Sequence, residues 1–131
     1  MKKAYIYTRS ATSPNKDSLN FQERALRKFA RKNKYLVSGV FTDEGVSGNS
    51  KRRPGLSKLF NHCEIAHVDA VLFYSIDRIG RDMGAINFVI NKLDLLKTRA
   101  ICLGDDIEDL RKTFLYQAMF FARINSKRGG N

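Results

Sequence analysis

Four arginines stand where they could share one anionic ligand. Arg9 follows the first predicted strand, Arg53 follows the loop after the second, and Arg78 and Arg81 follow the third. In an open sheet of parallel strands, ligands bind beyond the carboxyl ends of the strands. Guanidinium groups stay charged and match phosphate oxygens with paired hydrogen bonds. The pattern therefore predicts a phosphate site at one edge of a sheet, where cations can stabilise the charge of a transferring phosphoryl group.

The third arginine segment carries the closest spacing. Arg78 and Arg81 are three residues apart, so one turn of helix would let both face the same point. Asp77 lies beside them and could orient an arginine through a salt bridge. For any single arginine the alternative is an ordinary solvated surface charge. Arginines at several successive strand ends weaken that alternative, but spacing alone does not decide between the two.

Short apolar runs alternate with helical patterns along the chain. Strands are predicted over residues 4–7, 36–42, 69–74 and 100–103. Helices are predicted from a cap at Ser18 to Asn33, from Pro54 onward, and over the repeat from Ile86 to Leu96. This alternation predicts an α/β fold, with a mostly parallel sheet of four to five strands and helices on both faces.

The segment from about Asp109 onward predicts a helix of another kind. At about 100° per residue, its apolar residues cover most of the circumference. They are Phe114, Leu115, Ala118, Met119, Phe120, Phe121, Ala122 and Ile124. A surface helix in a monomer needs only one apolar stripe. We therefore expect a long C-terminal oligomerisation helix that packs against other subunits; the alternative is a central core helix of the same domain.

Charge and composition narrow the class of partner. The chain holds 24 Lys and Arg against 13 Asp and Glu, which gives a net charge of +11. Such a charge attracts polyanions and favours a nucleic acid partner over a merely soluble basic surface. The 131 residues, 43% of them hydrophobic, suffice for one domain with a real core. No apolar run or leader-like N-terminus points to a membrane, and two cysteines without a motif suit a reducing compartment, so we expect a cytoplasmic protein.

Three motifs resemble those of the serine recombinases of the resolvase and invertase family. Tyr7-Thr8-Arg9, followed by Ser18-Leu19-Asn20-Phe21-Gln22, is similar to the family's opening motif. Asp43-Glu44-Gly45-Val46-Ser47-Gly48 resembles the second, with Arg53-Pro54-Gly55-Leu56 after it. Ile76-Asp77-Arg78-Ile79-Gly80-Arg81-Asp82 is similar to the third, the most specific of the set. Their order and spacing agree across nearly the whole chain.

The resemblance implies site-specific cleavage and rejoining of double-stranded DNA, with no metal and no other cofactor. A serine attacks a phosphodiester and leaves a 5′-phosphoserine link and a free 3′-hydroxyl. Homodimers pair into a synaptic homotetramer through the last helix. Residues 1–108 would form the catalytic core, and residues 109–131 would begin an interface helix leading to a DNA-binding domain absent from the chain. Arg9, Arg78 and Arg81 would be catalytic. The supporting residues would be Tyr7, Gln22, Asp43, Ser47, Arg53 and Asp77.

The nucleophile position departs from the family pattern. The family's opening reads Tyr-x-Arg-x-Ser-Thr, whereas this chain has Ala11 at the serine position, and a methyl group cannot attack phosphorus. Ser10 is the candidate nucleophile, because it directly follows Arg9, and Ser13 is the second candidate. A shift of one residue in an extended segment reverses the direction of the side chain, which argues against a free exchange. The alternative is a catalytically inactive member that retains DNA binding and assembly.

A second departure lies in the last helix, where Ala122 precedes Arg123 in place of the family's common glutamate. Two rival classes are weaker. A flavodoxin-like effector domain would need a glycine-rich phosphate loop after the first strand, and residues 9–13 contain no glycine. Cys63 and His67, with His62 nearby, have a spacing that can ligate zinc. No second ligand pair is evident, so no metal site is predicted.

Overall fold

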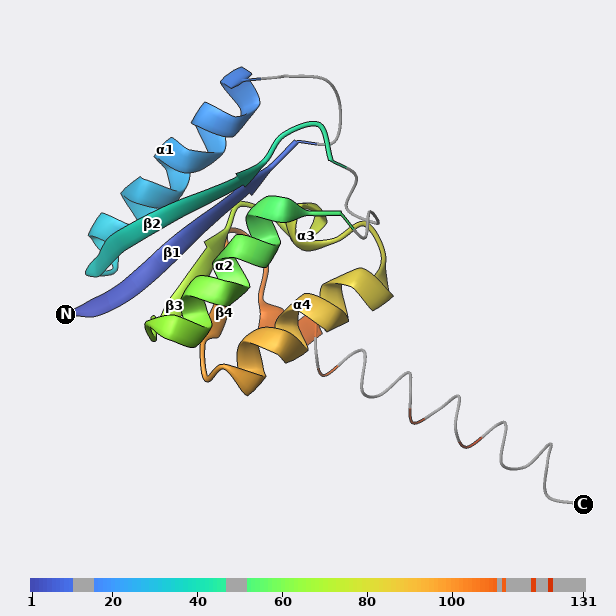
Figure 1. The fold of residues 1–131 in the computed structure, drawn as a ribbon. Coiled ribbons are helices and arrows are strands. Elements are labelled where there is room, and N and C mark those ends of the chain that lie inside the picture. Colours follow the sequence, from blue (N-terminus) through green and yellow to red (C-terminus); the bar gives the residue numbers. More distant parts are fainter. Residues whose placement is uncertain (11–15, 47–51, 111, 113–118, 120–122, 124–131) are drawn as a thin grey trace, which may run out of the picture.

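The chain folds as a parallel sheet with helices on both faces. The computed structural model describes residues 1–10, 16–46, 52–110, 112, 119 and 123. In chain order its elements are β1 (Lys2–Arg9), α1 (Lys16–Lys32), β2 (Tyr35–Asp43), α2 (Pro54–Ile65), β3 (Ala70–Phe73), α3 (Ile76–Ile79), α4 (Met83–Leu95) and β4 (Arg99–Cys102). Figure 1 shows α1 on one face of the sheet and α2 and α4 on the other. The predicted fold class is confirmed.

The sheet places its functional edge at the carboxyl ends of the strands. The strand order is β2-β1-β3-β4, and each neighbouring pair is parallel. The last residues of β1 and β2, Arg9 and Asp43, are register partners, and Tyr7 pairs with Phe73 of β3. The segments that follow these three strands therefore leave from the same edge, which we call the carboxyl edge. The predicted motifs begin there.

Two apolar clusters fix the sheet between its helices. Side chains alternate along a strand, so a doubly covered strand is apolar at every position. Tyr7 and Phe73 lie in the larger cluster with residues of α2 and α4, whereas Ile6 and Leu72 lie in the smaller cluster with Leu26 of α1. All five side chains are almost fully buried. Burial of both faces holds β1 and β3 rigidly, and with them the residues at their carboxyl ends.

The start of α1 differs from the prediction. The helix begins at Lys16, so the expectation that Ser18 caps it was wrong. Ser18 lies inside the helix, and its hydroxyl accepts a hydrogen bond from Nε2 of Gln22, one turn on, at 3.4 Å. The helix ends at Lys32, and Nδ2 of Asn33 donates to the carbonyl of Phe29 at 2.9 Å.

The arginines of the third motif do not share one helical turn, which corrects the prediction. Helix α3 ends at Ile79, and Gly80 is extended, with φ of −168° and ψ of 161°. A Cβ atom at Gly80 would lie 2.7 Å from Cβ of Ala85, so this position brings the chain against the start of α4. Arg78 therefore belongs to the helix, while Arg81 lies beyond it on an exposed segment.

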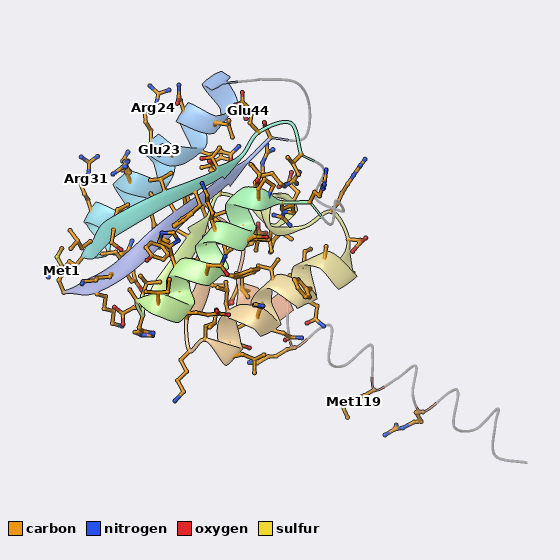
Figure 2. All side chains as sticks on the ribbon, viewed as in Figure 1. Met1, Glu23, Arg24, Arg31, Glu44 and Met119 are labelled. Carbon is orange, nitrogen blue, oxygen red and sulfur yellow. The ribbon has the colours of Figure 1, made fainter. Side chains whose placement is uncertain are left out.

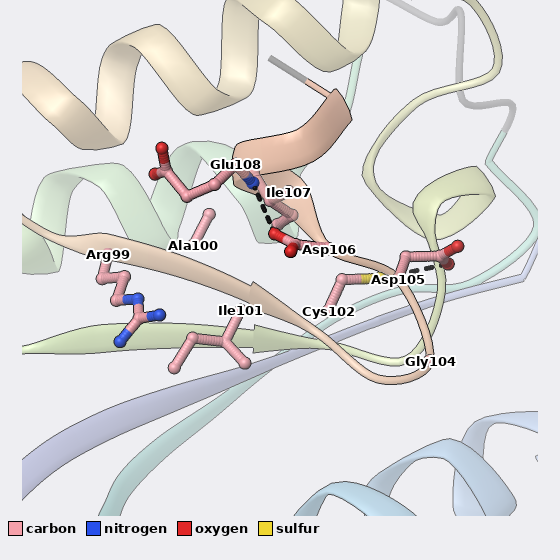
Figure 3. A pocket seen from close by; sticks show the side chains of 9 residues that line it. All are labelled: Arg99, Ala100, Ile101, Cys102, Gly104, Asp105, Asp106, Ile107 and Glu108. Carbon is pink, nitrogen blue, oxygen red and sulfur yellow. Dashed lines mark hydrogen bonds between the residues drawn. The ribbon is translucent and has the colours of Figure 1, made fainter. Parts of the chain in front are cut away.

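An acidic turn starts the last helix beside the edge strand β4. Oδ1 of Asp106 accepts hydrogen bonds from the amides of Glu108 and Asp109, at 3.0 and 3.3 Å, and residues 107–110 are helical. Figure 3 shows the neighbouring hollow of about 450 Å³, which the capped turn lines together with β4. The expected oligomerisation helix lies mostly outside the described residues. Within the described part of the chain, no helix is long and apolar enough to span a membrane.

Helix α2 is capped from a neighbouring strand. Asp43, the last residue of β2, accepts hydrogen bonds from the amide of Gly55 at 2.7 Å and from that of Leu56 at 3.0 Å. Pro54 occupies the first turn, where its missing N–H costs nothing. A carboxylate at a helix N-terminus is favourable because it meets unpaired amides and the positive end of the helix dipole. Asp43 thereby joins α2 to the carboxyl edge.

We predict that Gly55→Ala destabilises the protein by about 1–3 kcal/mol, because overpacking displaces backbone. A Cβ atom there would lie 2.4 Å from the carbonyl oxygen of Thr42. The matched control is Gly84→Ala in α4, whose nearest neighbour would be Oδ1 of Asp82 at 3.4 Å. We expect the control to be neutral or slightly stabilising, by up to about 1 kcal/mol. Urea unfolding of both variants measures this, and equal stabilities would contradict it.

Candidate phosphate-binding site

Three of the four predicted arginines meet at the carboxyl edge. The backbone carbonyl of Arg78 accepts a hydrogen bond from Nε of Arg9 at 3.3 Å and another from Nη2 of Arg53 at 3.0 Å. In return, Nη1 of Arg78 donates to the carbonyl of Arg9 at 3.0 Å. The end of β1, the residue before α2 and the helix α3 are therefore joined in one cluster, which we call the arginine cluster.

Arg9 is held from every side. It is only 3% exposed, and its guanidinium also donates to the carbonyls of Val46, at 2.8 Å, and Asp77. Gln22 of α1 clasps its backbone: Oε1 accepts from the amide of Arg9 at 3.3 Å, and Nε2 donates to its carbonyl at 3.1 Å. Burial lowers the pKa of Arg9, and the neighbouring Arg53 cation lowers it further. The side chain is a fixed positive charge in a desolvated place.

Arg53 is tied to the fold through a phenol and a carboxylate. It is 6% exposed, and its Nε and Nη2 donate to the hydroxyl of Tyr7 at 3.3 and 3.1 Å. That hydroxyl donates in turn to Oδ2 of Asp43 at 2.6 Å. Burial raises the pKa of Tyr7 far above its ordinary value, although Arg53 opposes the shift, so the phenol keeps its proton. The carboxylate that caps α2 thus also anchors Arg53.

Within the described residues, no carboxylate forms a salt bridge with the arginine cluster. Neither Arg9 nor Arg53 forms a salt bridge within the described residues, and their acceptors are backbone carbonyls and the Tyr7 hydroxyl. Buried charges are costly unless they are paired. Nε of Arg78 is also buried, with no hydrogen-bond partner in the described part of the chain. An orphaned buried donor costs about 1–3 kcal/mol. An anion with several acceptor oxygens, such as a phosphodiester, would supply both the charge and the missing acceptor.

Ser10 links β1 to the loop after β2. It is 4% exposed, its amide donates to the carbonyl of Asp43 at 3.0 Å, and its carbonyl accepts from the amide of Val46 at 2.9 Å. Its hydroxyl oxygen accepts from the amide of Gly45 at 3.1 Å. A hydroxyl can donate as well as accept, so this bond leaves its proton available. In the structure Ser10 orders the loop that carries the Val46 carbonyl to Arg9.

Two expected site residues do not bring their side chains into this network. Arg81 is exposed beyond α3. Asp77 is exposed, its carboxylate accepts from the hydroxyl of Ser75, and it meets Arg9 through its backbone carbonyl. Among the described residues, Asp77 therefore meets an arginine through a backbone contact and not through the expected salt bridge. Ser47, Ala11 and Ser13 lie outside the described residues.

The residues considered for zinc have other contacts in the structure. The ring of His62 stacks edge-on against Phe41, with 5.2 Å between ring centres, and its Nδ1 bonds with the carbonyl of Lys58 at 2.8 Å. Cys63 is buried, and burial raises the pKa of its thiol to about 11. Nε2 of His67 lies 3.9 Å from Oδ1 of Asp69. No group of three or more candidate metal ligands occurs in the described ranges.

Backbone groups supply the parts of the site that the sequence could not indicate. The carbonyls of Val46, Asp77 and Ile79 and the amide of Gly45 all bind motif side chains. Backbone acceptors carry no residue-type signal, so only the fold brings them to light. Gln22 was found through the family resemblance, and its clasp on Arg9 gives a physical reason for its place in the motif.

Comparison with known proteins places the geometry in context. The family model "Resolvase, N terminal domain" matches residues 4–125. The N-terminal catalytic domain of TP901-1 integrase is 29% identical, covering 95% of this chain and 99% of its own, with a TM-score of 0.80. The C-terminal catalytic domain of ISC1926 TnpA, an IS607-like serine recombinase, is 28% identical, covering 92% and 82%, with a TM-score of 0.71.

A resolvase family site-specific recombinase from Streptococcus pneumoniae shares the fold. It is 22% identical, covers 98% of this chain and 95% of its own, and has a TM-score of 0.73. No curated protein sequence is significantly similar to the chain.

We predict that Tyr7→Phe costs about 1–3 kcal/mol of unfolding free energy, because it removes an acceptor from buried Arg53 and a donor from Asp43. Tyr5→Phe is the matched control. Tyr5 lies on β1 like Tyr7, and its ring is buried beside Phe41 of β2. Its hydroxyl has no hydrogen-bond partner among the described residues. The control should stay within about 0.5 kcal/mol. If urea denaturation gives both variants the same small loss, the Tyr7 hydroxyl does not anchor the arginine cluster.

Proposed function

The chain belongs to the family of resolvase N-terminal domains, and on that premise we propose that it is a DNA recombinase catalytic domain that grips one phosphodiester with its arginine cluster. The observation that carries the proposal concerns the described residues: among them, buried Arg9 and Arg53 have no salt bridge, and the neighbouring buried Nε of Arg78 has no hydrogen-bond acceptor. A DNA phosphodiester carries one negative charge and unshared oxygens. It therefore satisfies what this edge of the sheet lacks.

Different arginines take different parts in this account. Arg78 is half-buried, and its Nε has no acceptor among the described residues; it binds the phosphate and stabilises the charge that develops on it. Arg81 is exposed beyond α3, and its guanidinium is the second cation proposed to contact the phosphate, from the solvent side. Arg9 and Arg53 each donate two hydrogen bonds to backbone carbonyls of α3, so they position Arg78 and raise the local positive potential.

The proposed reaction conserves phosphodiester bonds. A serine oxygen bonds to phosphorus, the bond from phosphorus to the 3′-oxygen breaks, and the serine proton ends on that oxygen. The products are a 5′-phosphoserine diester and a free 3′-hydroxyl. Because one phosphodiester replaces another, rejoining is the same step in reverse and draws on no nucleotide energy source.

Ser10 is the proposed nucleophile. The support is its position in the chain. Ser10 directly follows Arg9, whose carbonyl accepts a hydrogen bond from Nη1 of Arg78. To attack, the Ser10 hydroxyl must leave the Gly45 amide and align with the phosphate, since a serine needs orientation as well as proximity. DNA binding would have to reorder the loop formed by residues 43–46.

A second function is favoured by a specific observation. Ala11 occupies the position of the family's nucleophile, while the hydroxyl of Ser10 is buried and bonded to the Gly45 amide. A chain with that arrangement would bind a phosphodiester and assemble with other subunits without cutting DNA. The two functions share the arginine cluster and differ only in whether a covalent adduct forms.

A trapping experiment distinguishes them. The chain is incubated with nicked duplexes of randomised sequence, from which the fragment bearing the new 3′-hydroxyl diffuses away, and adducts are resolved under denaturing conditions. We expect an adduct with the parent chain that disappears in Ser10→Ala and falls at least about 100-fold in Arg78→Ala, as for other lost electrostatic donors. Loss in Ser13→Ala alone assigns the role to Ser13. If no version forms an adduct while DNA is still bound, the chain is a binding and assembly member.

Self-association through the segment after residue 109 is part of the proposal. Homodimers that pair into tetramers would explain why so many large apolar residues follow one another there. Met119, one of the described residues of this segment, is 60% exposed. Burying several such side chains at about 1.5–3 kcal/mol each is enough to drive association.

We predict that Phe121→Glu shifts the chain toward monomer in sedimentation velocity, because a carboxylate cannot enter an apolar interface without a large desolvation cost. Gln117→Glu is the control, since it adds the same charge at a polar position of the same segment. A parent chain that is monomeric at high concentration would contradict the assembly proposal, as would an unchanged oligomer in Phe121→Glu.

A further inference from the structure

We propose that the outer face of α1 is a second DNA-binding surface, which holds the backbone of the duplex beside the phosphate site. The inference rests on the proposed function for the identity of the polyanion. It concerns residues outside all three sequence motifs, and it assigns them to non-specific contacts with phosphates rather than to chemistry.

Cations dominate the second half of α1 and the two residues that follow it. Residues 24–34 contain six Lys or Arg and no Asp or Glu; the cations are Arg24, Arg27, Lys28, Arg31, Lys32 and Lys34. All six are exposed. Glu23, just before this run, is already paired with Arg27 at 2.9 Å. Like charges so close together repel one another, so the run costs stability unless an anion lies across it.

Geometry gathers these cations on the solvent side. Leu26 and Ala30 are buried against the sheet, and at 100° per residue Arg24, Lys28 and Arg31 fall within about 60° on the other side of the helix. Figure 2 shows Arg24 and Arg31 pointing away from the sheet. From Arg24 to Arg31 the axis rises about 10 Å, over which a duplex presents roughly six phosphates. The face is matched to a linear polyanion rather than to a single small anion.

The row of cations starts at the same level of α1 as the residue that contacts Arg9. Gln22, whose side chain clasps the backbone of Arg9, lies two residues before Arg24 on α1. Gln22 faces the sheet, whereas Arg24 lies about 160° around the helix on the solvent side, so the cations start at the level of Gln22 and continue along the outer face of α1. A duplex can place one phosphate at the carboxyl edge and a row of further phosphates over this outer face, which a compact anion cannot do. The linear row of cations and the proposed phosphate site together favour duplex DNA as the occupant.

The test compares two variants with the same change in net charge. Arg24→Gln/Lys28→Gln/Arg31→Gln removes three cations of α1, and the control Lys97→Gln/Arg99→Gln/Lys112→Gln removes three exposed cations elsewhere. Binding of a short duplex of arbitrary sequence is measured by fluorescence anisotropy over a series of salt concentrations. Each lost phosphate contact lowers the slope of log K against log salt by about 0.9. We expect the slope to fall by about 2–3 in the α1 variant and by less than about 1 in the control.

Equal changes in both triple variants would overturn the inference, because net charge alone would then explain the binding, and so would an unchanged slope in the α1 variant. Vesicles containing phosphatidylserine are a second probe: an equal loss of vesicle binding would make α1 a general anion surface and overturn the assignment to DNA. The trapping experiment is independent of this result. If no adduct forms but the slope falls in the α1 variant, the cleavage proposal fails and the α1 surface is supported. If an adduct forms but the slope does not change, the α1 surface fails and the cleavage proposal is supported.

Discussion

The backbone carbonyl of Arg78 accepts hydrogen bonds from two buried guanidinium groups, and the carboxyl edge of the sheet is organised around that oxygen. A neutral acceptor can satisfy the N–H donors of Arg9 and Arg53, but it cannot neutralise their charge. Parallel strands impose this crowding, because they send their connecting segments out at the same edge. The guanidinium groups of Arg9 and Arg53 are therefore hydrogen-bonded, but these cations have no salt-bridge partner among the described residues. A bound phosphate would supply the negative charge.

The same contacts hold the fold and shape the site. Asp43 caps α2 through two amides and receives the hydroxyl of Tyr7, which in turn supports Arg53. Gly55 is required where α2 meets the carbonyl of Thr42, because no Cβ fits there. The motif residues thus form one physical unit. A substitution at Tyr7 or Asp43 is expected to alter the position of Arg78 through Arg53, although neither residue is proposed to contact DNA. Stability and activity therefore have to be measured together for variants at this edge.

The sequence predicted the sheet, its helices and the meeting of arginines, because alternating apolar runs and strand-end positions depend on periodicity that a chain displays directly. It failed where a single local contact decides the geometry. Gly80 is extended and lies against Ala85 of α4, where no Cβ fits, and this break ends α3 before Arg81. Ser18 likewise falls inside α1 instead of capping it. The carbonyls that bind Arg9 and Arg53 had no signal at all, since every residue carries one.

The central claim is that Nε of Arg78 donates a hydrogen bond to a phosphate oxygen of bound DNA, and it can be tested at that one atom. In ¹H–¹⁵N spectra of the chain, the Nε–H signal of Arg78 is assigned by its loss in Arg78→Lys, and duplex DNA is then added. We expect that signal to move downfield and to be protected from exchange with water, because this buried donor, which has no acceptor among the described residues, gains one. A signal that stays unchanged while DNA is bound elsewhere would contradict the account, since the phosphate would not be held by the arginine cluster.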